Sequence, residues 1–471
     1  MRYNSTAEVS SMQKYDEGVI DEFLNQMRYE GNEIHAVSVY HDGELVLNKA
    51  FAPYKKDQLF PVWSVTKSFT SIAMGFMQEE NPVDLDEPWL SFFPEYKDIA
   101  AEGFEKVTIR HLLTMTMGQD NEAVIEHGDD WIANVISKPV VHEPGTKFFY
   151  NSHCTYLIGR LIEKRTGMKL SEYLRPRLFE PSGIEHWYWD EDQEGHCIGG
   201  YGLHLRTQDL ARVGECVLER GTFEEKQIIP EKWITEATKK QMDTFGAYSL
   251  HKSESNRGYG YCFWMCSHDA YRMSGMYGQI CFILPDEHLV IALNASVEGS
   301  QVVLSHIFKA LEENWGRCKV TYAVPAVKGN NDSPCLEWIL GKHSARNNPA
   351  GITGIEIIRK DNGLKFVLEK DKEKYSFTAE YGKWHSQKDA FTEISRSGYP
   401  DILKEENKVK NLYACCAFEQ PDLLHVEIRR EDLTAKYQLN FQIDRNWLKL
   451  DFHLEYMPTS FPKFTVFFPL R

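Results

Sequence analysis

Strand-like segments lie on both sides of a long, mostly helical stretch, residues 82–221. Before it, residues 34–40 and 44–50 flank His41-Asp42-Gly43, and an Asp-Gly pair between apolar-rich runs is a strong hairpin signal. After it, short apolar runs recur between residues 259 and 295. The backbone hydrogen-bonding groups of strands from both ends find partners when these strands pair in one sheet. We therefore expect an α+β domain, an antiparallel sheet flanked by helices with a helical insert.

The C-terminal part of the chain has a different pattern. Residues 324–334 are rich in Pro, Gly, Asn and Asp, which is typical of a linker. Six later runs alternate apolar and polar residues between short turns: residues 355–359, 364–370, 375–381, 423–429, 437–443 and 447–453. This alternation predicts a small antiparallel β-sheet or barrel. We expect a first domain over residues 1–320, a linker over 321–334 and a β-rich domain over 335–471.

Composition excludes some function classes. The 471 residues are 42% hydrophobic and 13% aromatic, as in a folded globular protein of more than one domain. The net charge of −16 argues against a nucleic-acid partner and against attraction to anionic membranes. The first residues lack the apolar segment of a secretory signal, and no apolar run approaches the ~18 residues that a membrane span needs. Ten cysteines without a regular framework suggest reduced thiols and a cytoplasmic protein.

One group of residues has a spacing loosely like that of metal ligands: Cys262, Cys266 and His268. The surrounding residues 259–266 read as a strand, so we interpret the cysteines as packing residues. We expect no metal site and no cofactor.

Ser64-Val65-Thr66-Lys67 stands at the start of an apolar-rich stretch, residues 68–77, that reads as a buried helix. A lysine three residues after a serine returns to the same helix face, so its ammonium can reach the serine oxygen. A serine at a helix N-terminus also lies near free backbone N–H groups, as an acyl-transfer nucleophile requires. The same pattern in Ser249-Leu250-His251-Lys252 lies in a polar stretch. The alternative for Ser64 is an ordinary N-cap serine.

A nucleophilic serine needs a base. A tyrosine near Lys67 could serve, because an adjacent ammonium lowers the pKa of a phenol. The best candidate is Tyr150, which ends an apolar run after a Pro-Gly turn. Asn151 or Ser152 then caps a helix that begins near Tyr156. The alternative is a core tyrosine whose hydroxyl is satisfied.

Acyl transfer also benefits from a strand edge beside the serine, which supplies a second N–H group and a cradle for the substrate. Residues 273–279 fit this role, because their glycines allow close backbone approach. A glycine-rich turn between strands is the alternative.

Three segments together resemble a known family. Ser64-x-x-Lys67, Tyr150-Asn151-Ser152 and Met273-Ser274-Gly275 are similar, in order and spacing, to the three motifs of the class C β-lactamases and related penicillin-recognising serine hydrolases. That group includes family VIII esterases, D-aminopeptidases and 6-aminohexanoate-dimer hydrolase. The resemblance covers about residues 16–315, with further similar segments at residues 108–115, 144–146, 199–203 and 209–212.

The resemblance implies a role for each motif. Ser64 would attack a carbonyl and form an acyl-enzyme, Lys67 would shuttle or stabilise protons, and Tyr150 would activate Ser64 and later a water. The backbone N–H groups of Ser64 and Met276 would form the oxyanion hole. Substrate contacts are implied for the remaining motif residues: Asn151, Ser152, Ser274 and Gly275.

Two departures bear on the substrate. Met273 stands where the family often has a lysine that helps hold a substrate carboxylate, and the adjacent Arg272 would point to the other face of a strand. Ser152 stands where the family often has an asparagine that contacts an amide side chain. Both changes favour a hydrolase of ester or amide bonds in a small molecule or peptide over one specific for penicillins.

Other readings stay open on sequence alone. One is a β-lactamase, a D-Ala-D-Ala carboxypeptidase or a D-aminopeptidase, and another is a catalytically silent ligand-binding member of the family. Residues beyond Cys335 lie outside the resemblance. Extra β-rich domains, some of them lipocalin-like, follow the hydrolase domain in several relatives. Such a domain could form a lid or a dimer surface, so a homo-oligomer is also open.

Overall fold

The computed structural model describes these parts of the chain: residues 17–126, 128–246, 253–312, 327, 329–331, 333–345, 348, 350–370, 372–388, 411–430, 436–455 and 464–470. Its first large sheet has six antiparallel strands in the order β2 (Glu44–Ala50), β1 (Glu33–His41), β11 (Leu289–Ser296), β10 (Ile280–Leu284), β9 (Tyr271–Ser274) and β8 (Trp264–Met265). The expected hairpin is confirmed. Its turn has φ values of 49° at Asp42 and 80° at Gly43, as a two-residue hairpin turn requires.

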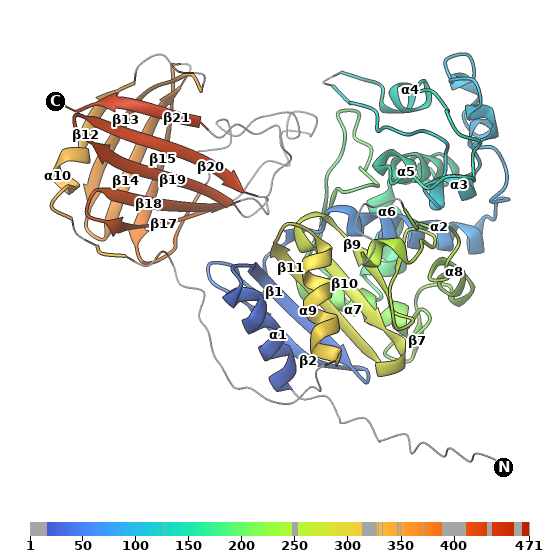
Figure 1. The fold of residues 1–471 in the computed structure, drawn as a ribbon. Coiled ribbons are helices and arrows are strands. Elements are labelled where there is room, and N and C mark those ends of the chain that lie inside the picture. The colour runs from blue at the N-terminus through green and yellow to red at the C-terminus, as the bar shows by residue number, and fades with distance from the viewer. Residues whose placement is uncertain are drawn as a thin grey trace, which may run out of the picture.

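Helices cover both faces of this sheet (Figure 1). α1 (Glu17–Tyr29) and α9 (Ser300–Glu312) lie on one face, and α7 (Thr207–Leu218) lies on the other. The buried residues of α1 have helical spacing, which is why this segment folds as an amphipathic helix: Ile20, Phe23, Leu24 and Met27. Because both faces are covered, every residue of β11 is buried.

The predicted helical insert is also confirmed, and it packs against the α7 side of the sheet in one continuous core. Its helices are α3 (Ile109–Leu113), α4 (Trp131–Ile136), α5 (Ser152–Thr166), α6 (Leu170–Leu174) and α7, and α2 (Thr66–Glu80) and α8 (Glu231–Ala237) flank it in the sequence. Two small sheets accompany them: β3 (Phe60–Pro61), β5 (Leu203–Leu205) and β4 (Tyr188–Trp189), then β6 (Thr222–Phe223) and β7 (Lys226–Gln227). Within the described residues, every helix is too short or too polar to cross a membrane.

The C-terminal part forms a nearly closed, barrel-like sheet with its own hydrophobic core. The short helix α10 (Leu336–Ile339) precedes it. Its strands follow the path β12 (Gly341–Ser344), β13 (Ile352–Lys360), β14 (Gly363–Lys370), β15 (Glu373–Tyr381), β17 (Leu412–Gln420), β18 (Leu423–Arg430), β19 (Lys436–Asp444), β20 (Trp447–Glu455) and β21 (Phe464–Pro469), with β16 (His385–Gln387) paired to β17. The end strands β12 and β21 lie close together, which nearly closes the sheet.

Four elements differ from the sequence-based expectations. β17 carries no alternation because Leu412 to Phe418 are all buried, so its pattern did not predict a strand. In residues 259–266 only Trp264 and Met265 form a strand, and Cys262 has a φ of 64° that breaks the extended backbone. α5 begins at Ser152, four residues before the expected start. β15 and β17 pair in parallel within an otherwise antiparallel barrel.

Two sequence features fall largely outside the described residues. They are most of the expected linker, residues 321–334, and the second Ser-x-x-Lys pattern, residues 249–252.

The barrel contacts the first sheet at the start of β1. Arg429 of β18 donates to Glu33 over 2.7 Å, and Lys436 lies 3.4 Å from the same carboxylate. The ring of Tyr413 on β17 packs against Tyr54, whose hydroxyl also donates to Glu33. A charged, buried contact therefore joins the barrel to the first sheet.

Candidate active site

Lys67 makes hydrogen bonds to residues from three segments of the candidate site. Ser64 lies in the 3₁₀ turn Trp63–Val65 that leads into α2, and Lys67 lies in the first turn of that helix. The Nζ of Lys67 donates to the Oγ of Ser64 over 2.8 Å. It also donates to the Oγ of Ser152 over 3.2 Å and to the carbonyl oxygen of Gly200 over 2.8 Å. An ammonium has three N–H groups, so these three partners use all of them.

The environment of Lys67 makes its ammonium easier to deprotonate than that of an exposed lysine. The side chain is 1% exposed, and burial lowers the pKa of Lys67 to about 8 against the opposing charge of Glu122. The face of the Tyr150 ring lies 4.8 Å from Nζ, which is a cation–π distance. A lysine of this pKa is partly neutral at mildly alkaline pH. It can then accept the proton of a neighbouring hydroxyl, which is the first requirement of a serine nucleophile.

Hydroxyl groups on α2 fix the loops around this lysine. The Oγ1 of Thr66 accepts the N–H of Leu203, and Thr70 donates to the carbonyl of Gly199. On the opposite side of the helix turn, Ser68 donates to the carbonyl of Cys262. These buried hydroxyl groups of α2 thus hold two distant loops in place. One of these loops brings Gly200 to Lys67.

Strained backbone adjoins Ser64. Trp63, directly before Ser64, has a φ of 49°, and Tyr277 has a φ of 61°. Both values are unusual for bulky side chains. The two rings are buried and pack edge to face, with centroids 5.6 Å apart. This contact holds the turn that presents Ser64 against the end of β9.

The second motif lies at the N-terminus of α5. Tyr150 stands just before the helix, and its ring stacks on Trp264 at 5.3 Å. Asn151 is the N-cap: its side chain is buried and accepts the N–H of His153 over 2.9 Å. Ser152 is the first helical residue and is half-buried. The hydroxyl of Ser152 therefore faces Lys67, whereas the side-chain oxygen of Asn151 is engaged in capping the helix.

The third motif packs against the segment before Ser64. Met273 is fully buried in the core, and Ser274 is half-buried at the end of β9. A Cβ atom on Gly275 would lie 2.4 Å from the carbonyl oxygen of Val62, so only glycine fits this approach. Met276 follows with its side chain 45% exposed. The backbone N–H of Met276 as an oxyanion donor stays a prediction.

Arg272 is directed away from Met273, as the strand alternation predicts. Its guanidinium is fully buried and donates to the carbonyl of Met265, to the Sγ of Cys266 and to Ser255. Cys266 is thus engaged with an arginine. Among the described residues, no group of three or more His, Cys, Asp or Glu side chains could hold a metal ion.

Comparison with known proteins identifies the family. The β-lactamase family model matches residues 28–311, more than half of the chain. The chain belongs to the β-lactamase family. It is 24% identical over 183 residues to a β-lactamase from Escherichia coli, covering 34% of this chain and 48% of that protein. It is 26% identical over 193 residues to the esterase EstB from Burkholderia gladioli, covering 36% and 49%. The chain spans about half the length of the curated relatives it matches.

A solved structure resembles this β-lactamase-family chain over nearly its whole length. The octameric penicillin-binding protein homologue from Pyrococcus abyssi has a TM-score of 0.50 and 17% sequence identity, and the match covers 96% of this chain and 100% of that one. At this identity the similarity concerns the fold alone. The fold match includes the barrel as well as the first sheet.

Sequence reasoning gave no role to two residues that contact the site of this β-lactamase-family chain. Gly200 supplies a carbonyl to Lys67, and a Cβ atom there would lie 2.7 Å from the backbone oxygen of Ser152. The consecutive glycines at 199 and 200 were the available signal. Glu122 is exposed and accepts the backbone N–H of Ser152. No local pattern marks Glu122, because its partner lies 30 residues away.

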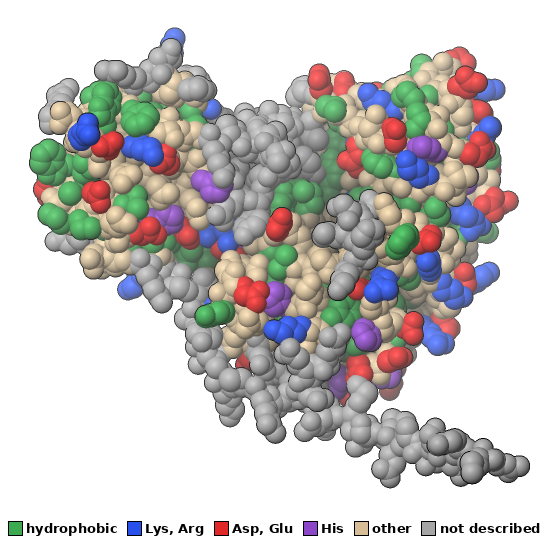
Figure 2. Space-filling model, viewed as in Figure 1, with side chains coloured by type: hydrophobic (Ala, Val, Ile, Leu, Met, Phe, Trp, Pro, Cys, Tyr) green, Lys and Arg blue, Asp and Glu red, His purple; other side chains and the backbone are tan. Residues whose placement is uncertain are grey.

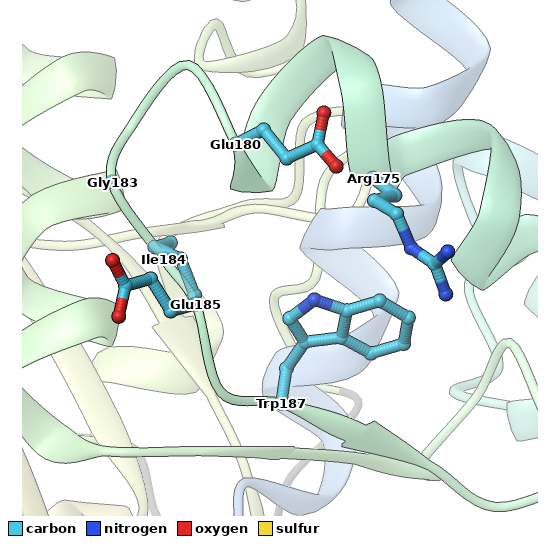
Figure 3. Close-up of a pocket in the computed structure, with 6 residues that line it drawn as sticks. All are labelled: Arg175, Glu180, Gly183, Ile184, Glu185 and Trp187. Atoms are coloured by element: carbon cyan, nitrogen blue, oxygen red, sulfur yellow. The ribbon is translucent and has the colours of Figure 1, made fainter.

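A separate concavity of about 630 Å³ lies near the end of α6 (Figure 3). It is lined by Arg175, Glu180, Gly183, Ile184, Glu185 and Trp187. The Arg175 guanidinium lies 5.4 Å from the centre of the Trp187 ring. These lining residues contain no serine, cysteine or lysine, so we do not assign the reaction to this concavity. Figure 2 shows acidic, basic and hydrophobic side chains interspersed over the described part of one face.

Proposed function

We propose that this chain is a serine hydrolase that cleaves an ester or amide bond of a small molecule or peptide through an acyl-enzyme on Ser64. The observation that carries the proposal is the 2.8 Å hydrogen bond between Ser64 and a buried Lys67, whose pKa is lowered to about 8. A neutral amine at this distance can take the hydroxyl proton as the serine oxygen attacks a carbonyl carbon.

The other motif residues take the roles that the family resemblance implies. Tyr150 assists Lys67 in activating Ser64 and later activates a water that hydrolyses the acyl-enzyme, and its ring 4.8 Å from the Lys67 Nζ supports this role. The backbone N–H groups of Ser64 and Met276 stabilise the oxyanion. Ser274 and Gly275 line the strand edge along which the substrate lies, and Asn151 supports the site from its capping position.

Charge in the site supports a substrate without a carboxylate at the third motif. Met273 is buried and Arg272 is engaged on the far face of β9, so neither offers a cation there. The carboxylate of Glu122 beside Ser152 repels an anionic substrate group. These features favour neutral esters or amides over a penicillin or a peptide ending in D-Ala-D-Ala.

The test combines active-site labelling with turnover. The protein is incubated with a fluorophosphonate probe and with short-chain p-nitrophenyl esters, and Ser64→Ala is the matched control. We expect labelling and ester turnover that both vanish in Ser64→Ala. Absence of labelling and of Ser64-dependent turnover would favour the second candidate, a catalytically silent ligand-binding member of the family.

A chromogenic cephalosporin distinguishes the other enzymatic candidates. Hydrolysis at a rate that rivals the esters would favour a β-lactamase, and release of D-Ala from a D-Ala-D-Ala peptide would favour a D,D-carboxypeptidase. Release of a free N-terminal D-residue would favour a D-aminopeptidase. We expect all three rates to fall well below the best ester rate.

The remaining expectations are proposals of the same kind. Residues 1–320 form the hydrolase domain and residues 335–471 the β-rich domain, joined by residues 321–334. The protein is cytoplasmic, and the octameric homologue supports self-association of this chain as well. Light scattering on the full chain as it elutes from a size-exclusion column measures the oligomeric state.

A further inference from the structure

We propose that the hydroxyl of Ser152 passes a proton to the leaving group when the acyl-enzyme forms. This inference rests on the proposed function and adds a catalytic residue to it. The family resemblance implies only a substrate contact at this position. The geometry around Lys67 points to a direct role of Ser152 in proton transfer.

The hydrogen-bond partners of Lys67 differ in whether they can pass on a proton. Its three N–H groups are directed to Ser64, Ser152 and the Gly200 carbonyl. A carbonyl oxygen has no proton to pass on. A serine hydroxyl both accepts and donates, so Ser152 is the partner of Lys67, besides the nucleophile, that can relay a proton. Ser152 is half-buried, so it is not enclosed in the core.

Tyr150 faces Lys67 differently. Nζ lies 4.8 Å from the centre of the Tyr150 ring, so the ammonium meets the aromatic face. The three hydrogen bonds already use the N–H groups of Lys67. The hydrogen bond to Ser152 gives Lys67 a direct path for a proton, and Tyr150 is the alternative relay that the experiment must separate from it.

Three contacts hold Ser152 in this position. Its backbone N–H donates to the carboxylate of Glu122. Asn151 caps the helix that Ser152 begins. Gly200 packs against the backbone oxygen and the Cβ of Ser152, at distances that leave no space for a further side-chain atom. These contacts fix the backbone and the Cβ atom of Ser152, and the hydrogen bond from Lys67 orients its hydroxyl, which is the preorganisation that proton relay requires.

For an ester, acylation begins with proton transfer from Ser64. Neutral Lys67 receives the proton of the Ser64 hydroxyl while the Ser64 oxygen forms a bond to the carbonyl carbon. Lys67 then gives a proton to the Ser152 oxygen, and the Ser152 hydroxyl proton moves to the oxygen of the leaving alcohol. The carbon–oxygen bond breaks, and the electron pair stays with that oxygen. Lys67 ends neutral, Ser152 ends as a hydroxyl, and the alcohol departs uncharged.

The test uses two esters of one acid. An alkoxide needs a proton to leave, whereas p-nitrophenolate leaves readily without one. We measure kcat/KM, which reports acylation, for the ethyl and p-nitrophenyl esters with the wild type, Ser152→Ala and Ser152→Asn. We expect both variants to lose on the order of 10²-fold or more on the ethyl ester and less than about 10-fold on the p-nitrophenyl ester.

Ser152→Asn separates relay from positioning. Its side-chain oxygen can still accept from Lys67, but it has no hydroxyl to pass a proton through. Recovery of ethyl-ester activity in Ser152→Asn, or an equal loss on both esters in Ser152→Ala, overturns the proposal. Tyr150→Phe is the further control, and a selective ethyl-ester loss there but not in Ser152→Ala assigns the relay to Tyr150 instead. Ser64-independent hydrolysis would instead overturn the proposed function itself, which keeps the two failures distinct.

Discussion

Arg429 and Glu33 form a two-pronged ion pair across 396 residues of sequence. The Nε and Nη2 atoms of Arg429 donate to the Glu33 carboxylate at 2.7 to 3.0 Å. Burial alone would raise the pKa of Glu33, but the charges of Arg429 and Lys436 hold it well below its usual range. The barrel is therefore joined to the first sheet by a buried charge cluster, in which Lys436 also lies beside Glu33 and Glu427 also accepts from Arg429.

Arg429→Met should destabilise the protein by about 3 kcal/mol, because it removes the guanidinium that makes three hydrogen bonds to the buried Glu33 carboxylate. Urea unfolding measures the loss. Glu33→Gln in the Arg429→Met background should recover part of it, since the uncompensated charge is then gone. The matched control is Lys239→Met, which breaks an exposed pair with Glu236 and should leave stability nearly unchanged. Equal effects of the two single variants would contradict a buried ionic contact.

The same contact predicts acid sensitivity. The pKa of Glu33 is depressed in the folded state, so the stabilisation is present above its ordinary value of 4.5 and is lost as pH falls through the folded value. Thermal unfolding of the wild type should therefore drop steeply in acid. Arg429→Met should show a shallower dependence over the same range, and parallel curves would contradict this.

Activity should depend on the protonation of Lys67. Because burial lowers the pKa of Lys67 to about 8, kcat/KM should rise with pH through about 8 and then level off. Glu122 opposes this shift, so Glu122→Gln should lower the pKa of Lys67 further and move the midpoint to lower pH. The glutamine oxygen can still accept the Ser152 N–H, which makes the variant a matched one. A flat profile, or a midpoint that does not move, would count against Lys67 as the proton acceptor.

Glu215 on α7 predicts a second pH effect, on stability. It is 3% exposed, both of its carboxylate oxygens lack a hydrogen-bond partner, and burial raises the pKa of Glu215 to about 7. Its folded pKa exceeds the ordinary 4.5, so stability should fall as pH rises from 4.5 to about 7. Glu215→Gln should remove this dependence and stabilise the protein above pH 7 by about 1–3 kcal/mol. Glu172→Gln, at an exposed site on α6, is the control and should change neither.

Gly200→Ala should impair catalysis more than it impairs folding. The added Cβ would lie 2.7 Å from the backbone oxygen of Ser152, so the loop must move away from α5 and take its carbonyl from Lys67. We expect kcat/KM to fall on the order of 10²-fold. Gly299→Ala is the matched control, because a Cβ there meets nothing within 4 Å. Wild-type activity in Gly200→Ala would show that the loop adapts without disturbing Lys67.

What the sequence could predict depended on how far apart the interacting residues lie. The Asp42-Gly43 hairpin and the apolar face of α1 are local, so periodicity and turn chemistry were sufficient. The Ser64–Lys67 contact is also local, since three residues of helix bring the two side chains together. In contrast, β17 is buried on both sides, which erases the alternation that marks a strand.

The contacts that the sequence could not supply join distant segments. Glu122 meets Ser152 only when its loop folds against the start of α5, and Gly200 meets Lys67 only when a loop 133 residues away folds against α2. Arg429 meets Glu33 only after both sheets have formed. Such partners carry no periodicity of their own, and the consecutive glycines at 199 and 200 were the one local trace of a close approach.

The assembly of the site from three segments has a consequence during synthesis. Ser64 and Lys67 emerge together, but Ser152 follows Lys67 by 85 residues and Gly200 by 133. Until those segments are made and packed, the lysine is an ordinary solvated cation and the serine an ordinary alcohol. Under the proposed function, the nascent chain is therefore inert toward esters, and reactivity arises only once these segments have packed together. The appearance of a covalent probe adduct would thus report when a newly made chain has folded.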